Sequence, residues 1–273
     1  MKFDNTNFHG KLHLQKFGLH NLLKVIADFK SCTLEEFSAR SKLPQGKSSG
    51  KVMSFSYYAE YCGLIDCDIN SGNYKANLTD LGKAVLNNDP FLLDPKTHLL
   101  LYLVISSKVR GNVLFHTFVN KVIPSLNQNI SFEIDSLRDD FSRADMAKTN
   151  FDAVSNFFLE FDRIPHIKLV DKKMFIEALP LSTQFLPIVE NFLLYLWANS
   201  PHKDAEQISI TQILSMGFHN YFRWTEGYLK RYLEEICEYS TRLNIQTQPN
   251  VFVRRNCGLK VTLDVVSDGV YSC

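Results

Sequence analysis

The stretch VMSFSYYAEYCGLIDCDINSGNYKANL, residues 52–78, contains the pattern that decides the fold. Apolar residues recur at helical spacing from Val52 to Cys62, and Gly63 follows them as a typical helix stop. Two short apolar runs then flank the turn at residues 70–73, which predicts a β-hairpin. A helix that leads directly into a hairpin is typical of a winged-helix domain, in which the hairpin is the wing.

The sequence before this stretch supplies two more helices. Residues 19–29 (LHNLLKVIADF) place their apolar side chains on one helical face. Thr33 and Glu36 fit a capping box, so a short second helix is expected to run to about Arg40. After a break at residues 43–46, the third helix can start at Ser48 or Ser49. Residues 1–90 therefore predict an N-terminal winged-helix domain.

The same order of elements recurs twice. Helices are expected at residues 113–126, 132–141 and 151–162, with a hairpin over 166–179, and again at 185–198, 211–216 and 224–241, with a hairpin over 243–255. The sequence thus predicts a mostly α-helical α+β protein with small β-hairpins, built from tandem winged helix-turn-helix units. Residues 91–180 would form a helical connector and a second winged-helix-like unit, and residues 181–273 a third.

Charge limits how such a protein could hold nucleic acid. The composition is that of a folded globular protein, with 45% hydrophobic and 22% charged residues, and the net charge is only +1. Any DNA-binding surface must therefore come from local clusters of Lys and Arg. Two acid-free stretches carry such clusters, residues 40–58 and residues 239–263.

These stretches and the first predicted wing supply the candidate DNA contacts. We expect the start of the third helix to enter the major groove and Lys75 to lie on the wing near phosphate. The predicted DNA-binding residues are Arg40, Lys42, Lys47, Ser48, Ser49, Lys51, Ser54, Lys75, Arg254 and Arg255.

No pattern in the chain indicates catalysis. The glycines and lysines of residues 46–51 lack the earlier glycine and the preceding strand of a phosphate-binding loop. No G-x-S-x-G nucleophile pattern occurs. His9 and His13 could share a helical face, with His20 nearby, but no third metal ligand is fixed by spacing, so polar histidines on an N-terminal segment are the preferred interpretation. The sequence predicts a non-catalytic protein without a cofactor or metal.

The expected location is the cytoplasm. The longest apolar runs, residues 99–105 and 192–198, fall short of the roughly 20 residues needed to cross a bilayer, so no membrane partner is expected. The N-terminus has no apolar stretch of a secretory signal. The cysteines form no C-x-x-C pair and are interpreted as reduced thiols.

Several segments resemble a bacterial family of unknown function that is encoded in DNA phosphorothioation and phage-defence gene clusters. They are Phe8-His9-Gly10 with Leu22-Leu23-Lys24, residues 57–65 (YYAEYCGLI), Leu78-Thr79-Asp80-Leu81-Gly82, residues 89–94 (DPFLLD) and Asn256-Cys257-Gly258-Leu259. The family's early Gly-His-Glu stretch is absent, because Lys11 and Leu12 follow Gly10. The resemblance implies a DNA-modification or defence context and offers no known catalytic residues to carry over to this chain.

Together these observations predict a non-catalytic DNA-binding accessory or regulatory protein. Its partners would be DNA and other proteins of a defence or modification complex, and a homodimer is compatible with the sequence. The alternative is a protein-interaction scaffold of winged-helix domains without direct DNA contact, which the near-neutral charge favours. The DNA sequence recognised, the protein partners, the oligomeric state and the roles of the second and third units stay open.

Overall fold

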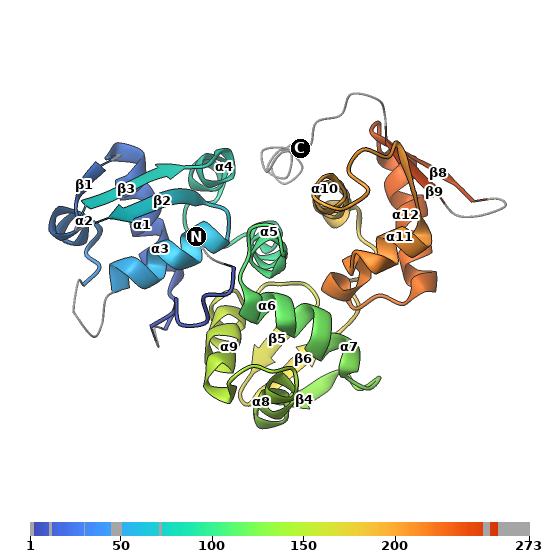
Figure 1. The fold of residues 1–273 in the computed structure, drawn as a ribbon, viewed down its shortest axis with the longest axis horizontal. Coiled ribbons are helices and arrows are strands. Elements are labelled where there is room, and N and C mark those ends of the chain that lie inside the picture. Colours follow the sequence, from blue (N-terminus) through green and yellow to red (C-terminus); the bar gives the residue numbers. More distant parts are fainter. Residues whose placement is uncertain are drawn as a thin grey trace.

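The computed structural model describes residues 3–10, 13–29, 31–44, 51–70, 73–247 and 252–255. In these residues helices alternate with small antiparallel sheets (Figure 1), which confirms the predicted α+β class. No helix in the described ranges is both long and apolar enough to cross a membrane.

One order of elements occurs three times, as a helix, a short strand, two helical segments and a hairpin. The first unit contains α1 (Lys16–Asp28), β1 (Ser31–Thr33), α2 (Leu34–Ser41), α3 (Lys51–Tyr61), β2 (Ile65–Asn70) and β3 (Asn73–Leu78). Two helices connect it to the second unit, α4 (Asp80–Asn88) and α5 (Pro95–Ser106). The predicted domain limit at residue 90 falls between these two helices.

The second and third units repeat this order. The second contains α6 (Val113–Thr117), the π-helical turn η1 (Phe118–Val122), α7 (Ile123–Ser125), β4 (Ser131–Glu133), α8 (Ile134–Arg143), the 3₁₀ turn η2 (Lys148–Asn150), α9 (Phe151–Glu160), β5 (Ile167–Val170) and β6 (Lys173–Ile176). The third contains the 3₁₀ turn η3 (Thr183–Phe185), α10 (Leu186–Ala198), β7 (Gln207–Ser209), α11 (Ile210–Ser215), the 3₁₀ turn η4 (Phe218–Phe222), α12 (Glu226–Tyr239), β8 (Leu243–Gln246) and β9 (Phe252–Arg255).

Each unit has a three-residue strand that the sequence pattern did not predict. These strands complete sheets of order β1-β3-β2, β4-β6-β5 and β7-β9-β8. Each runs directly into a helix, and Thr33 is both the last residue of β1 and the N-cap of α2. Its predicted capping box is present, because Thr33 Oγ1 accepts from the Glu36 amide at 3.2 Å and the Glu36 carboxylate accepts from the Thr33 amide at 2.9 Å.

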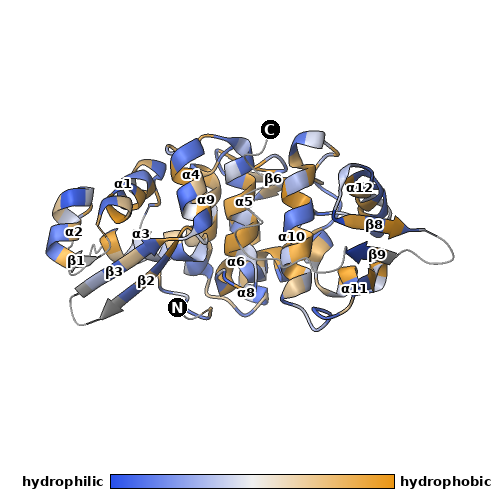
Figure 2. Ribbon diagram, turned by 90° about the horizontal axis from the view of Figure 1, so that it is seen from above, coloured by the Kyte–Doolittle hydropathy of each residue, from blue (hydrophilic) through white to orange (hydrophobic). Residues whose placement is uncertain are grey.

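Helix α5 is the centre of the molecule. Every residue from Thr97 to Ser106 is 0% exposed, as expected for a helix that is apolar on all sides. Helix α10 is buried from Ile188 to Trp197 and packs against α5. Figure 2 shows these two helices between the first unit and the hairpin of the third, and Figure 1 shows the second unit below α5.

A single carbonyl oxygen joins α5 to the second and third units. The carbonyl oxygen of Tyr221, in η4, accepts from the Tyr102 hydroxyl of α5 at 2.9 Å and from His166 Nε2 at 2.9 Å. The Tyr221 hydroxyl donates in turn to the Ser106 carbonyl at 3.3 Å. All four residues are buried, so these hydrogen bonds fix the geometry of the apolar junction.

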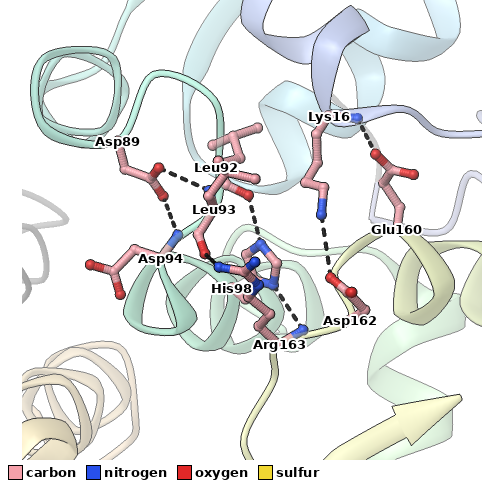
Figure 3. Close-up of polar contacts among 9 residues, drawn as sticks. All are labelled: Lys16, Asp89, Leu92, Leu93, Asp94, His98, Glu160, Asp162 and Arg163. Atoms are coloured by element: carbon pink, nitrogen blue, oxygen red, sulfur yellow. Dashed lines mark hydrogen bonds and ion pairs between the residues drawn. The ribbon is translucent and has the colours of Figure 1, made fainter.

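Polar contacts also attach the first unit to the second (Figure 3). The Lys16 amide at the start of α1 donates to the Glu160 carboxylate at 2.5 Å, and Lys16 Nζ lies 3.3 Å from Asp162 Oδ1. Because Glu160 ends α9, these contacts join the start of α1 in the first unit to the end of α9 in the second.

His98 of α5 reinforces the same joint (Figure 3). Its Nδ1 accepts from the Arg163 amide at 3.1 Å, so the proton is on Nε2, which donates to the Leu92 carbonyl at 2.7 Å. Burial lowers the pKa of His98, and protonation of Nδ1 would remove the acceptor of the Arg163 amide.

Two helical glycines provide a test of the packing around α4. An added Cβ at Gly82 would lie 1.9 Å from the Leu64 carbonyl oxygen, whereas a Cβ at Gly227 in α12 would meet nothing within 4 Å. Gly82→Ala should therefore lower the free energy of unfolding by about 1–3 kcal/mol through overpacking. Gly227→Ala, the control, should raise it by up to about 1 kcal/mol through helix propensity. Urea unfolding measures both, and equal effects of the two substitutions would contradict the packing.

A second test concerns pH. Burial lowers the pKa of His166 to about 4. An unfolded histidine titrates near pH 6.5, so the unfolded state takes up protons first and stability is lost as the pH falls below that value. His166 should reduce the free energy of unfolding by about 2 kcal/mol between about pH 7 and about pH 5.

Urea titrations at several pH values measure this dependence. His166→Gln should flatten the slope of unfolding free energy against pH, whatever its effect on absolute stability. The control is His13→Ala, because His13 is exposed. If the unfolding free energy of His166→Gln depends on pH as steeply as that of the parent, His166 is not the source of the pH dependence.

Candidate nucleic-acid interface

The turn between α2 and α3 gathers three of the predicted DNA-binding residues. Arg40 is exposed in the last turn of α2, Lys42 is exposed at its C-cap, and Lys51 begins α3. The Lys51 amide donates to the Pro44 carbonyl at 3.1 Å, which holds the two helix ends together. Within the described residues none of the three side chains has an ion-pair partner. We call Arg40, Lys42 and Lys51 the turn cluster.

Arg40 is held on the surface by an aromatic side chain. Its guanidinium carbon lies 3.8 Å from the ring centroid of Phe29, which follows α1. This cation–π contact orients the charge and leaves it exposed. The predicted contacts Lys47, Ser48 and Ser49 lie outside the described residues.

The prediction for Ser54 is wrong. Ser54 is only 7% exposed, and an added Cβ at Gly10 would lie 3.0 Å from its Oγ. Phe8 of the same N-terminal segment packs edge-on against Tyr58 and Tyr61 of α3, at 4.8 and 4.9 Å between ring centroids. On α3 only Lys51, Met53, Tyr57 and Glu60 are half-exposed and the other residues are buried, so the body of this helix offers only a narrow stripe to a major groove. Its one basic side chain, Lys51, lies at its start.

The first hairpin is less basic than predicted. Lys75 is exposed on β3, but the strand register places Asp68 of β2 directly opposite it. Asp66 lies on the same strand as Asp68 and forms an ion pair with Arg110 at 2.5 Å. Opposite charges at facing positions attract each other, so Lys75 contributes little positive potential beyond the hairpin.

The corresponding turns of the other units have no free basic cluster. In the second unit Arg143 pairs with Asp140 and Lys148 with Asp139. In the third unit Arg223 donates to backbone carbonyls of Ile176, Asn127 and Asn129, and so ties this unit to the second. Of the three turns, as far as the structure describes them, the first alone presents unpaired basic side chains.

The third helical element of the third unit is acidic. Glu226, Glu234, Glu235 and Glu238 are exposed on α12, against one exposed basic residue, Arg231, and one half-exposed one, Lys230, which pairs with Glu226 at 2.7 Å. A duplex carries a phosphate charge about every 1.7 Å of its axis and would be repelled by this surface. Helix α12 is therefore unsuited to enter a groove of DNA.

Arg254 and Arg255 are adjacent on β9, so their side chains point to opposite faces of the strand, as predicted. Arg254 has 61% of its side chain exposed and lies 3.4 Å from Glu206. Arg255 lies with its guanidinium carbon 5.2 Å from the Trp197 ring centroid and donates to the Lys203 carbonyl at 2.5 Å. Arg254 is thus the outward-facing arginine, and Arg255 covers α10.

A polar cavity of about 930 Å³ lies where the N-terminal segment meets α8 and α9 of the second unit. Burial lowers the pKa of His9, which forms a hydrogen bond with the Asn150 side chain. The sequence interpretation of His9 and His13 as polar histidines on an N-terminal segment missed this cavity, because its opposite wall is far away in the chain. We call it the polar cavity; its lining includes Asn7, His9, His13, Arg138, Asp152 and Asn156.

The chain resembles known proteins in its structure and not in its sequence. No protein-family model matches the chain, and no curated protein matches it. A crystal structure of SspB superposes with a TM-score of 0.66 and 13% identity over 97% of this chain and 86% of the other. A crystal structure of magnesium ion-bound SspB superposes with a TM-score of 0.63 and 13% identity over 92% and 83%. The chain shares the SspB fold.

The likeness to SspB extends over all three units, because it covers 92–97% of the chain. At 13% identity it is a likeness of fold. In the described residues no group of three His, Cys, Asp or Glu side chains could hold a metal ion.

The two arginines of β9 yield a prediction for stability. Arg255→Ala removes a cation–π contact and a hydrogen bond, and should lower the free energy of unfolding by about 1–2 kcal/mol. Arg254→Ala removes an exposed ion pair and should change it by less than about 0.5 kcal/mol. Thermal melting of the two single variants measures the difference, and equal melting temperatures would contradict the placement of Arg255.

Proposed function

We propose that the chain is an accessory protein of a DNA-modification or phage-defence system, and that it binds the DNA backbone through the turn cluster. The observation that carries this proposal is the difference between the three equivalent turns. As far as the turns are described, the same backbone arrangement presents Arg40, Lys42 and Lys51 without ion-pair partners in the first unit, ion-paired residues in the second and a half-buried structural arginine, Arg223, in the third.

The arrangement of each unit supports a winged-helix interpretation. A helix, a short strand, two helical segments and a hairpin, with the first strand paired to the last, is the order expected of that domain. In winged helices the turn before the third helix and the hairpin approach the DNA backbone. The turn cluster occupies this position in the first unit.

Burial of α3 favours backbone contact over base readout. Base-specific recognition in the major groove needs an exposed helix face with several side chains directed at base edges. Beyond Lys51 the half-exposed stripe of α3 carries only Met53, Tyr57 and Glu60, whereas the lysine and arginine side chains of the turn cluster can reach phosphates. The expected binding is therefore salt-dependent and nearly independent of DNA sequence.

The context of the proposal is supported by the SspB fold. SspB is a phosphorothioation-system protein, which agrees with the gene-cluster context implied by the family resemblance. The proposed accessory role includes no chemical step. Incubation of supercoiled plasmid with the chain and Mg²⁺ tests this part, and chain-dependent nicking would replace the accessory role with a catalytic one.

The acidic surface of α12 favours a second function for the third unit. Its exposed glutamates repel DNA and would attract a basic protein surface. We propose that this unit contacts a protein partner of the same system. This assignment keeps the scaffold alternative for one part of the chain and leaves DNA contact with the first unit.

The DNA proposal is tested by removing the turn cluster. Simultaneous Arg40→Ala, Lys42→Ala and Lys51→Ala should weaken duplex binding on any sequence, because phosphate contacts are lost. The slope of log affinity against log salt concentration should fall by about 0.9 for each lost contact. Fluorescence anisotropy of labelled duplexes over a salt series measures both quantities.

The matched control removes the same charge elsewhere. Lys108, Lys121 and Lys203 are exposed outside the first unit, so their triple replacement by Ala lowers the net charge equally. This control should keep most of the affinity and the salt slope of the parent. Equal losses in the two triple variants would mean that DNA responds to net charge alone, and would overturn the assignment of the turn cluster.

A further inference from the structure

The polar cavity is open to solvent on one side and lined by parts of the chain that lie far apart in sequence. Asn7, His9 and His13 come from the N-terminal segment, and Arg138, Asp152 and Asn156 come from α8 and α9. Figure 1 shows the N-terminal segment passing between α3 and α9. A volume of about 930 Å³ is within the range of small-molecule sites, about 300–1,000 Å³.

The charge of this cavity does not favour a phosphate. Arg138 lies between two carboxylates, with Nη1 at 2.8 Å from Asp135 and Nη2 at 2.7 Å from Asp152. Its positive charge is therefore more than balanced. His9 is buried, and burial favours its neutral form. A neutral polar molecule suits this environment better than an anion does.

The side chains of the cavity carry donors and acceptors side by side. Asn7 and Asn156 each offer an amide N–H and an amide oxygen, and Asp152 offers carboxylate oxygens next to the N–H groups of Arg138. Nucleobase edges present adjacent donors and acceptors of this kind, and asparagine, arginine and acidic side chains are the usual partners for them. The exposed ring of His13 at the cavity margin can stack on a base.

The cavity also lies close to the turn cluster. Gly10 lines it and lies over Ser54 of α3. Ser54 is three residues after Lys51, which is about 4.5 Å along a helix axis. The start of α3 and the cavity wall at Gly10 therefore lie on either side of Ser54.

We propose that the polar cavity binds a nucleobase. The base can come from a free nucleoside or from an unpaired or extruded nucleotide of DNA. The second source rests on the proposed function, because the turn cluster would then hold the strand that supplies the base. The first source does not depend on DNA binding.

Calorimetric titration of the full chain with the four deoxynucleosides tests the first source. At least one nucleoside should saturate a single site, and Asn156→Ala should weaken its binding roughly tenfold by removing a hydrogen-bonding side chain. Asp152→Asn should change which nucleoside binds best, because one acceptor becomes a donor. The control is Asn21→Ala, since Asn21 is also a half-buried helical asparagine but lies on α1. Thermal melting identifies any variant that fails to fold.

A single strand that carries one fluorescent base analogue tests the second source. Binding should change the fluorescence of the analogue in the parent and in Asn21→Ala, and much less in Asn156→Ala. Replacement of that nucleotide by an abasic one should weaken binding to the parent but not to Asn156→Ala.

A response in either arm supports the proposal and identifies the source of the base. Absence of nucleoside binding together with equal affinity for abasic and normal strands overturns it. If the parent binds no DNA at all, the proposed function fails, while the nucleoside titration still decides whether the cavity is a base site.

Discussion

The burial of α5 is the constraint on which the rest of the structure depends. A helix without a polar side must be covered all round. Residues of all three units pack against it, including Gly63 of the first unit, α6 of the second and α10 of the third. Because the apolar contacts are not directional, a few buried hydrogen bonds decide the orientation, and the Tyr221 carbonyl provides the acceptor for two of them.

This packing explains why three similar units have different surfaces. The turn that stays open in the first unit is used for internal attachment in the third, where Arg223 satisfies three carbonyls at the junction. In the second unit the same position is neutralised by adjacent aspartates. Repetition of backbone architecture thus does not imply repetition of function, because function depends on which side chains remain unpaired after assembly.

The position of the N-terminal segment affects both α3 and the polar cavity. By packing Phe8 against Tyr58 and Tyr61, it covers one side of α3 and narrows the surface that a DNA-reading helix would need. By the same path it brings His9 and His13 opposite α8 and α9, and so forms the polar cavity. The basic turn of the first unit and the exposed glutamates of α12 give this near-neutral chain separate surfaces for partners of opposite charge.

The sequence alone determined what depends on neighbours in the chain. The helices, the hairpins and the Thr33 capping box were predictable because periodicity, turn chemistry and capping act over a few residues. Strands β1, β4 and β7 were not, because three residues carry no pattern and become strands only when a hairpin strand offers them hydrogen bonds. Exposure of Arg40 and Lys42 could be predicted from the acid-free stretch, but burial of Ser54 could not, because Gly10 covers it from a distant segment. The polar cavity likewise needs His9 and Arg138 on facing walls, and only the packing around α5 decides which distant side chains face each other.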